Sequence, residues 1–118
     1  IVMTSHCDFP ATSGSPYDPF GIMEIAVTGS TPYPGEPDRF SRPWWPEELI
    51  TREQALQALT VNGAWQMHCE NERGNIKVGK YADFLLVDKD VMECPVRDIH
   101  NAKVVSTWFE GEKVYQAE

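Results

Sequence analysis

The sequence predicts a mixed α/β fold, and three observations support this prediction. A short apolar run at residues 1–4 has the composition of a buried strand. Two segments between residues 18 and 67 carry helix-start signals followed by apolar residues at helical spacing. Runs of β-branched and aromatic residues follow from residue 76 to residue 115 and are typical of strands.

Length and charge exclude several classes of protein. The chain has 118 residues, with 10 basic and 18 acidic side chains and a formal charge of −8. A complete eight-stranded α/β barrel takes about 250 residues, so the chain is too short to be one. Nucleic acids and anionic membranes are held by clustered Lys and Arg, which this acidic chain lacks. With three widely spaced cysteines and no apolar run near the roughly 20 residues of a membrane span, we expect a soluble cytoplasmic protein with reduced thiols.

The first element is expected to be a buried strand at residues 1–4 that stops at the polar cluster Ser5-His6-Cys7-Asp8. Pro10 then prevents further strand pairing. Because α/β folds place working residues at the carboxyl ends of strands, Asp8 is a candidate site residue. Its structural alternative is an Asx turn or a cap. Cys7 is a candidate nucleophile, but the pattern favours a small buried thiol.

The first helix is expected to start at Asp18-Pro19, since Asp caps helices and Pro suits the first helical position. Phe20, Met23 and Val27 would then share one face, and Gly29 would end the helix. Eight of the nine prolines lie at or before residue 46, so the rest of this first part is predicted to be mostly loop.

The second helical segment is expected from a capping box at Thr51–Gln54, in which each residue bonds the backbone of the other. Apolar residues continue at helical spacing to Met67, and the polar segment at 70–74 would end the helix at Gly74. Poor helix formers at 60–63 can break it into two helices, with Thr60 or Asn62 as the second cap.

Strands are predicted in the last third of the chain. Residues 76–78 alternate before a turn at Gly79-Lys80, and the continuous apolar run at 84–87 indicates a strand covered on both faces. A further strand is expected at 104–109, and a turn at 110–112 would convert it into a hairpin with 113–115.

Two His-Cys pairs, His6-Cys7 and His68-Cys69, invite a zinc site. Adjacent ligands do not reach one tetrahedral centre easily, and the spacing is unlike that of structural zinc sites, so the pattern argues against it. His68 is expected near the negative pole of a helix end, and His100 in a solvated connection.

Four segments of the chain, taken in sequence order, form a set of motifs. They are Ser5–Pro10; Thr51–Leu56 with Thr60–Ala64; Gly74–Phe84; and Val104–Thr107 with Gly111–Tyr115. Together they resemble the C-terminal end of a metal-dependent amidohydrolase, in the branch that includes N-substituted formamide deformylases. The most specific of them reads Gly-x-Ile-x-x-Gly-Lys-x-Ala-Asp-Phe.

The resemblance implies the C-terminal end of a (β/α)8 TIM barrel beside a small composite β-sandwich, incomplete on its own. Residues 1–73 would hold the last barrel strand, an active-site loop and the last helices, and residues 74–118 the C-terminal sandwich strands. Asp8 matches the aspartate that binds a divalent metal, usually zinc, and acts as general base in hydrolysis of an amide-type, non-peptide C–N bond. The family often has Gly-Ser-Asp where this chain has His6-Cys7-Asp8, so His6 and Cys7 receive no role.

The other metal ligands that the resemblance requires precede the last barrel strand and are absent from these residues. We therefore expect the chain alone to hold no zinc tightly and to be inactive. Its expected partners are the missing N-terminal part of the same enzyme and a small amide-type substrate. Unpaired edges and faces of such a fragment would favour a homo-oligomer.

A small stand-alone interaction module is the rival reading. In that case Trp44 and Trp45 in the proline-rich loop would bind a partner, whereas packing of both rings under the loop is their structural alternative. The chain begins with Ile1, so either Met3 is the start or the chain is part of something longer. A start at Met3 would favour the module.

Overall fold

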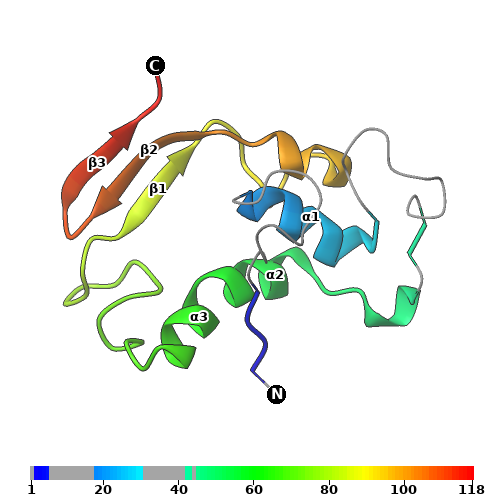
Figure 1. Ribbon diagram of the computed structural model, residues 1–118, viewed down its shortest axis with the longest axis horizontal. Coiled ribbons are helices and arrows are strands. Elements are labelled where there is room, and N and C mark those ends of the chain that lie inside the picture. Colours follow the sequence, from blue (N-terminus) through cyan, green and yellow to red (C-terminus); the bar gives the residue numbers. More distant parts are fainter. Residues whose placement is uncertain (1, 6–17, 31–41, 44) are drawn as a thin grey trace.

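The computed structural model describes residues 2–5, 18–30, 42–43 and 45–118. Within these residues, the three strands lie together at one side of the molecule (Figure 1). Helix α1 (Pro19–Thr28) packs against α2 (Arg52–Leu59) and against the 3-10 helix η3 (Val96–Asn101). The sheet comprises β1 (Phe84–Val87), β2 (Val104–Phe109) and β3 (Glu112–Gln116), and the remaining helices are α3 (Val61–Gln66), directly after α2, and the 3-10 helix η2 (Pro46–Glu48).

Helix α1 begins and ends where the sequence predicts. The Asp18 side chain accepts a hydrogen bond from the backbone N–H of Phe20 at 3.0 Å, and Pro19 occupies the first position. Gly29 ends the helix with a φ of +65°, a left-handed conformation that glycine adopts without steric cost. This part of the prediction is confirmed.

The capping box of α2 is also confirmed. The backbone N–H of Gln54 donates to Thr51 Oγ1 at 3.2 Å, and Gln54 Oε1 accepts from the backbone N–H of Thr51 at 2.9 Å. The chain breaks at Thr60, as expected, but neither candidate acts as a side-chain cap for α3. The Thr60 hydroxyl donates back to the Leu56 carbonyl at 2.6 Å, and Asn62 Nδ2 donates to the Met3 carbonyl at 2.7 Å.

Helix α3 ends earlier than predicted, at Gln66 and not at Gly74. His68 has a φ of +58°, its N–H bonds the Trp65 carbonyl, and the N–H of Cys69 bonds the Ala64 carbonyl, both at 3.0 Å. These two bonds form a Schellman motif, which usually places glycine where His68 stands. The sequence lacks the glycine that would have marked this helix end, because His68 takes the left-handed conformation instead. His68 does lie at a helix end, as expected.

The sheet is antiparallel, in the order β1-β2-β3. Thr107 on the central strand pairs with Leu85 on one side and Tyr115 on the other. Glu110 and Gly111 both have positive φ, +52° and +84°, as a two-residue type I′ hairpin requires. The predicted hairpin is confirmed.

Two other predicted strands are wrong. Residues 2–5 form no strand, and the N–H of Ser5 instead donates to the carbonyl of Ala58 on α2 at 3.3 Å. Residues 76–78 form no strand either, and the side chain of Ile76 is 82% exposed. A strand needs a neighbour for its backbone groups, and neither segment pairs with the three strands that the structure describes.

The expected burial of β1 on both faces is also wrong. Leu85 and Leu86 are 45% and 52% exposed. Among the described elements, β1 packs against β2 alone, so no helix covers either face of the strand. An apolar run of this kind indicates two covering layers only where those layers are present.

The apolar core lies where α1, α2 and η3 meet. Its most buried member is Ile99 on η3, with Met23 of α1 against it. Arg52 fastens the segment before η3 to α2: its guanidinium donates to the carbonyls of Val91, Met92 and Cys94, at 3.1, 2.7 and 2.7 Å. The other buried core residues are Ala55, Val91 and Ala102.

Candidate functional site

The predicted site residue, Asp8, lies outside the described residues, as do His6 and Cys7. The structure does describe the chain on both sides of them. Before them, the backbone of Met3 and Ser5 is bonded to α3 and α2 by Asn62 and the Ala58 carbonyl. After them, Asp18 caps α1. The described residues before this segment therefore contact α2 and α3, and those after it begin α1.

A small hollow of about 70 Å³ lies under the first of these anchors. Its lining is mainly apolar and combines residues 3–5 with side chains of α1 and α2, among them Met23 and Ala58. The volume is too small for an organic substrate, because ligand pockets occupy roughly 300–1,000 Å³. We therefore interpret this hollow as imperfect packing beneath residues 3–5 and not as a substrate site.

The alternative zinc site from two His-Cys pairs gains no support. His6 and Cys7 are outside the described residues, and Cys69 donates its thiol to the Ala64 carbonyl, with a Sγ to O distance of 3.5 Å. Across the part of the chain that the structure describes, no three His, Cys, Asp or Glu side chains form a group that could hold a metal ion. His68 and Cys69 belong to the end of α3, where they close the Schellman motif.

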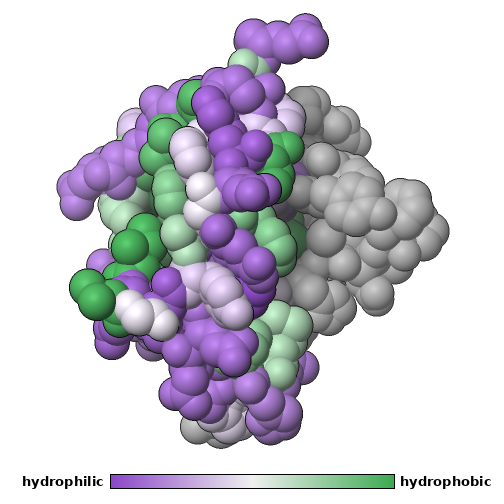
Figure 2. Space-filling model, turned by 90° about the vertical axis from the view of Figure 1, so that its left-hand side faces the viewer, coloured by the Kyte–Doolittle hydropathy of each residue, from purple (hydrophilic) through white to green (hydrophobic). Residues whose placement is uncertain are grey.

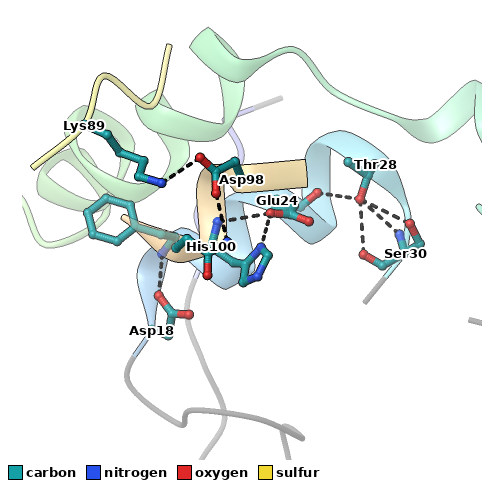
Figure 3. A network of polar contacts seen from close by, with 9 residues as sticks. Asp18, Glu24, Thr28, Ser30, Lys89, Asp98 and His100 are labelled. Atoms are coloured by element: carbon teal, nitrogen blue, oxygen red, sulfur yellow. Dashed lines mark hydrogen bonds and ion pairs between the residues drawn. The ribbon is translucent and has the colours of Figure 1, made fainter. Parts of the chain in front are cut away.

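The structure brings together a pair that the sequence did not predict, Glu24 of α1 and His100 of η3 (Figure 3). Glu24 is fully buried, and its Oε2 accepts from the backbone N–H of His100 at 3.0 Å and lies 2.7 Å from His100 Nδ1. The expectation that His100 is solvated holds only in part: its side chain is 24% exposed, but its Nδ1 and its backbone N–H contact the buried Glu24. One signal was available, because Glu24 lies four residues after Phe20 and next to Met23, on the helix face predicted to be apolar.

A second ion pair lies beside this one. Lys89 Nζ is 2.7 Å from Asp98 Oδ2, and Asn101 Nδ2 donates to Asp98 Oδ1 at 2.9 Å. The hydrogen bond from Lys89, and then the one from Asn101, hold the pKa of Asp98 below its usual value. In turn, the hydrogen bond to Asp98 raises the pKa of Lys89. Asp98 and Lys89 are therefore both charged at neutral pH, and the pair ties η3 to the segment that follows β1.

The proline-rich part contains a wider hollow of about 420 Å³. Trp45 and Leu49 line it from one side, α1 residues from the other, and Glu48 is the charged group in its wall. Trp45 is 61% exposed, and Trp44 lies outside the described residues. For Trp45, the structure does not support the alternative in which the ring is packed under the loop.

Comparison with known proteins gives the clearest information on function. Residues 1–115 match the amidohydrolase family. An N-substituted formamide deformylase of Arthrobacter pascens is 30% identical over 100 residues, which cover 85% of this chain and 17% of that protein. An imidazolonepropionase of Shewanella frigidimarina is 49% identical over 39 residues, covering 33% of this chain and 10% of that protein.

A solved structure is similar as well. An amidohydrolase from Thermotoga maritima MSB8 superposes with a TM-score of 0.50 and 25% identity, over 60% of this chain and 17% of that one. The chain thus spans about one sixth of the length of the deformylase and of the solved amidohydrolase. Among the described helices, none is long and apolar enough to cross a membrane.

Proposed function

Because the chain belongs to the amidohydrolase family, we propose that it is the C-terminal part of a metal-dependent hydrolase that cleaves carbon–nitrogen bonds other than peptide bonds. The observation that carries this proposal is the family match over residues 1–115, which includes Asp8 and continues into the hairpin. In this proposal residues 1–73 belong to a TIM barrel and residues 74–118 to a composite β-sandwich. The similarity to a formamide deformylase supports a small amide-type substrate.

Asp8 is the residue that we propose carries the chemistry. Its carboxylate would take a proton from the attacking water and pass it to the leaving nitrogen. A divalent ion, zinc in this proposal, would supply the activation of that water when it is bound. A catalytic zinc takes about three protein ligands, and the described residues offer no such group. We therefore propose that Asp8 acts together with ligands from outside this chain, and that the chain alone is inactive.

The described residues on either side of Asp8 are held to the helices. Residues 3–5 are bonded to α2 and α3, and the Asp18 cap fixes the start of α1. A catalytic carboxylate has to be held in place by its surroundings, since small displacements reduce the rate strongly. Both anchors belong to the helical half of the structure and not to the hairpin.

The decisive experiment is to read the encoding frame upstream of Ile1 and to assay the protein that it encodes. We expect a His-x-His motif after a predicted strand, and hydrolysis of N-substituted formamides or related amides. Asp8→Asn should lower kcat by about 10² to 10⁴, the usual contribution of a general base. Asp88→Asn is the matched control, because its amide oxygen can still accept the bond from the backbone N–H of Lys103. Equal activity of the two variants would refute the role of Asp8.

The metal proposal has a separate test on the 118-residue chain. Plasma emission analysis of the purified chain should find less than one zinc ion per molecule. The chain should hydrolyse amides no faster than buffer without protein does. Stoichiometric metal in the chain alone would contradict the proposal that the other ligands lie elsewhere.

Partners and location are further parts of the proposal. Figure 2 views the end of the molecule that carries the hairpin, where apolar patches lie among hydrophilic residues. Leu85, Leu86 and Val114 of the sheet are each more than two-fifths exposed. We propose that the N-terminal part of the enzyme covers such surfaces, and that the isolated chain forms a homo-oligomer instead. A monomeric mass in light scattering across micromolar concentrations would contradict the second statement.

We further propose a cytoplasmic protein with no nucleic-acid or membrane partner. Cys69 and Cys94 are free, which suits a reducing compartment, and the charge of −8 opposes polyanion binding. The measurements are fractionation of cells that express the native gene and electrophoretic shift with duplex DNA. Co-sedimentation with anionic vesicles or a DNA shift at physiological salt would contradict this part.

The rival function, a stand-alone interaction module, is favoured by one observation. Exposed Trp45 lines the 420 Å³ hollow beside Leu49, and exposed tryptophans are common anchors for protein partners. The upstream frame separates the two functions. A start codon at Met3 with no coding sequence before it would support the module and overturn the hydrolase.

A further inference from the structure

The Glu24–His100 pair, drawn in Figure 3, joins a buried group to a partly exposed one. Glu24 is 0% exposed, whereas the His100 side chain is 24% exposed. Oε2 of the carboxylate takes both contacts from His100, while Oε1 is buried and has no partner among the described residues. The carboxylate therefore depends on one residue, and that residue can exchange protons with solvent.

The protonation state of His100 decides how well this carboxylate is compensated. A buried carboxylate is costly unless a positive charge or several hydrogen bonds accompany it. The protonated imidazole supplies a charge and a charge-assisted hydrogen bond at 2.7 Å, whereas the neutral ring supplies at most one neutral N–H. Thr28 does not help, because its hydroxyl donates to the main-chain carbonyl of Glu24 and not to the carboxylate.

The surrounding charges do not replace His100. Asp98, on η3, interacts electrostatically with His100, and Lys89 pairs with Asp98 at 2.7 Å. From α2, Arg52 donates to the carbonyls of the segment before η3. At the start of α1, Asp18 caps the backbone of Phe20. Asp98 carries a charge opposite to that of a protonated imidazole, and Lys89 is already paired with Asp98.

We propose that Glu24 and His100 form a pH-sensitive latch, which docks α1 on η3 while the imidazole is protonated and loosens when the imidazole becomes neutral. The two groups are 76 residues apart in the sequence and join two elements that pack against each other. Histidine is the side chain that usually changes charge between about pH 5 and 8. The docking of α1 is then tightest at the acidic end of this range and weakens as the pH rises.

The latch lies next to the segment that carries Asp8, because α1 begins directly after residues 6–17. The inference itself does not depend on the proposed function, since its test uses no activity measurement. If the hydrolase proposal fails, the latch proposal is unaffected, and if the latch proposal fails, the hydrolase proposal is unaffected.

Amide hydrogen exchange on the unmodified chain at pH 5.5 to 8 tests the proposal, after correction for intrinsic exchange rates. The N–H of Gly29, bonded to Ile25, reports on α1, and the N–H of Ala102, bonded to Ile99, reports on η3. The N–H of Ala55 in α2 is the internal reference. We expect protection of the first two to fall about tenfold relative to the third as the pH rises. Equal changes at all three amides, or no change, would overturn the latch.

Variants assign the effect to His100. His100→Gln should show the loosened protection at every pH, with no pH dependence left between 5.5 and 8. His68→Asn is the matched control: it removes another imidazole, and asparagine accepts the left-handed backbone of this position. It should keep the pH dependence of the unmodified chain. If the dependence survives in His100→Gln, or disappears in His68→Asn, the latch is wrong. Should His100→Gln not fold, the exchange data on the unmodified chain still decide.

Discussion

Arg73 and Asp83 join the segment after α3 to the start of β1 through a hydrogen-bonded ion pair. The same guanidinium reaches Glu110 in the hairpin turn at 2.5 Å and lies over the rings of Tyr81 and Phe109, 4.6 and 4.7 Å from their centres. Asp83 also accepts from the backbone N–H of Glu110 at 2.8 Å. One planar cation thus holds the hairpin to the segment before the sheet.

Replacing Arg73 by Lys should therefore lower stability although the charge is kept. A lysine cannot donate to two carboxylates in a fixed plane while it stacks between two rings. Urea denaturation followed by tryptophan fluorescence should give a lower midpoint than for the unmodified chain. Arg97→Lys, at an exposed position of η3, is the control and should leave the midpoint unchanged. Equal midpoints for the two variants would show that charge alone matters at position 73.

Two glycines should respond to alanine in opposite directions. Gly74 has a φ of +91°, and an added Cβ would lie 2.6 Å from the Cβ of Ala64. Gly74→Ala should cost about 2 kcal/mol or more, because it combines backbone strain with a clash. Gly63 lies in α3 with open space around it, so Gly63→Ala should stabilise by about 0.5–1 kcal/mol. Chemical denaturation measures the change in unfolding free energy for each variant. If both variants were stabilised, or both destabilised, the prediction would be wrong.

Local chemistry explains which elements the sequence could predict. The Asp18 cap, the Thr51–Gln54 capping box and the Glu110-Gly111 turn each depend on residues within four positions of one another. Such signals are complete in the sequence. The end of α3 was missed because His68 takes a conformation that is usually left to glycine.

Long-range features could not be predicted in the same way. Residues 76–78 alternate like a strand, but a strand requires a neighbour that no local pattern supplies. The Glu24–His100 pair depends on two elements meeting, and only the burial of Glu24 was visible as an acidic residue on an apolar helix face. For the candidate site, the role of Asp8 remains a prediction that rests on family membership and not on geometry.

Arg52 should contribute more to the stability of the fold than an ordinary side chain on the surface of a helix. Its three hydrogen bonds to main-chain carbonyls fix the segment before η3 on α2. Arg52→Ala should destabilise the chain by about 2–3 kcal/mol, the range for hydrogen bonds from a charged donor. The stability of Arg52→Lys should lie between that of the unmodified chain and that of Arg52→Ala, since one ammonium group cannot make all the hydrogen bonds of the planar guanidinium. Gln57→Ala, on the exposed side of the same helix, should stay within about 0.5 kcal/mol of the unmodified chain.

Asp98 and Lys89 predict a contribution to stability that disappears in acid. Lys89 lowers the pKa of Asp98, so the folded state holds this carboxylate ionised at a pH where the unfolded chain already binds a proton. The contribution is therefore complete above the usual Asp value near 3.8 and is lost as the pH falls through the lowered value.

Asp98→Asn removes this contribution. Its urea midpoint should lie below that of the unmodified chain at pH 7, and the difference should shrink below about pH 4. Added salt should also reduce the difference at pH 7, because the pair is partly exposed and screened. Glu47→Gln, at an exposed position of η2, should follow the unmodified chain at every pH. A difference for Asp98→Asn that is equal at pH 7 and pH 3 would mean that packing of the side chain, and not its charge, stabilises η3.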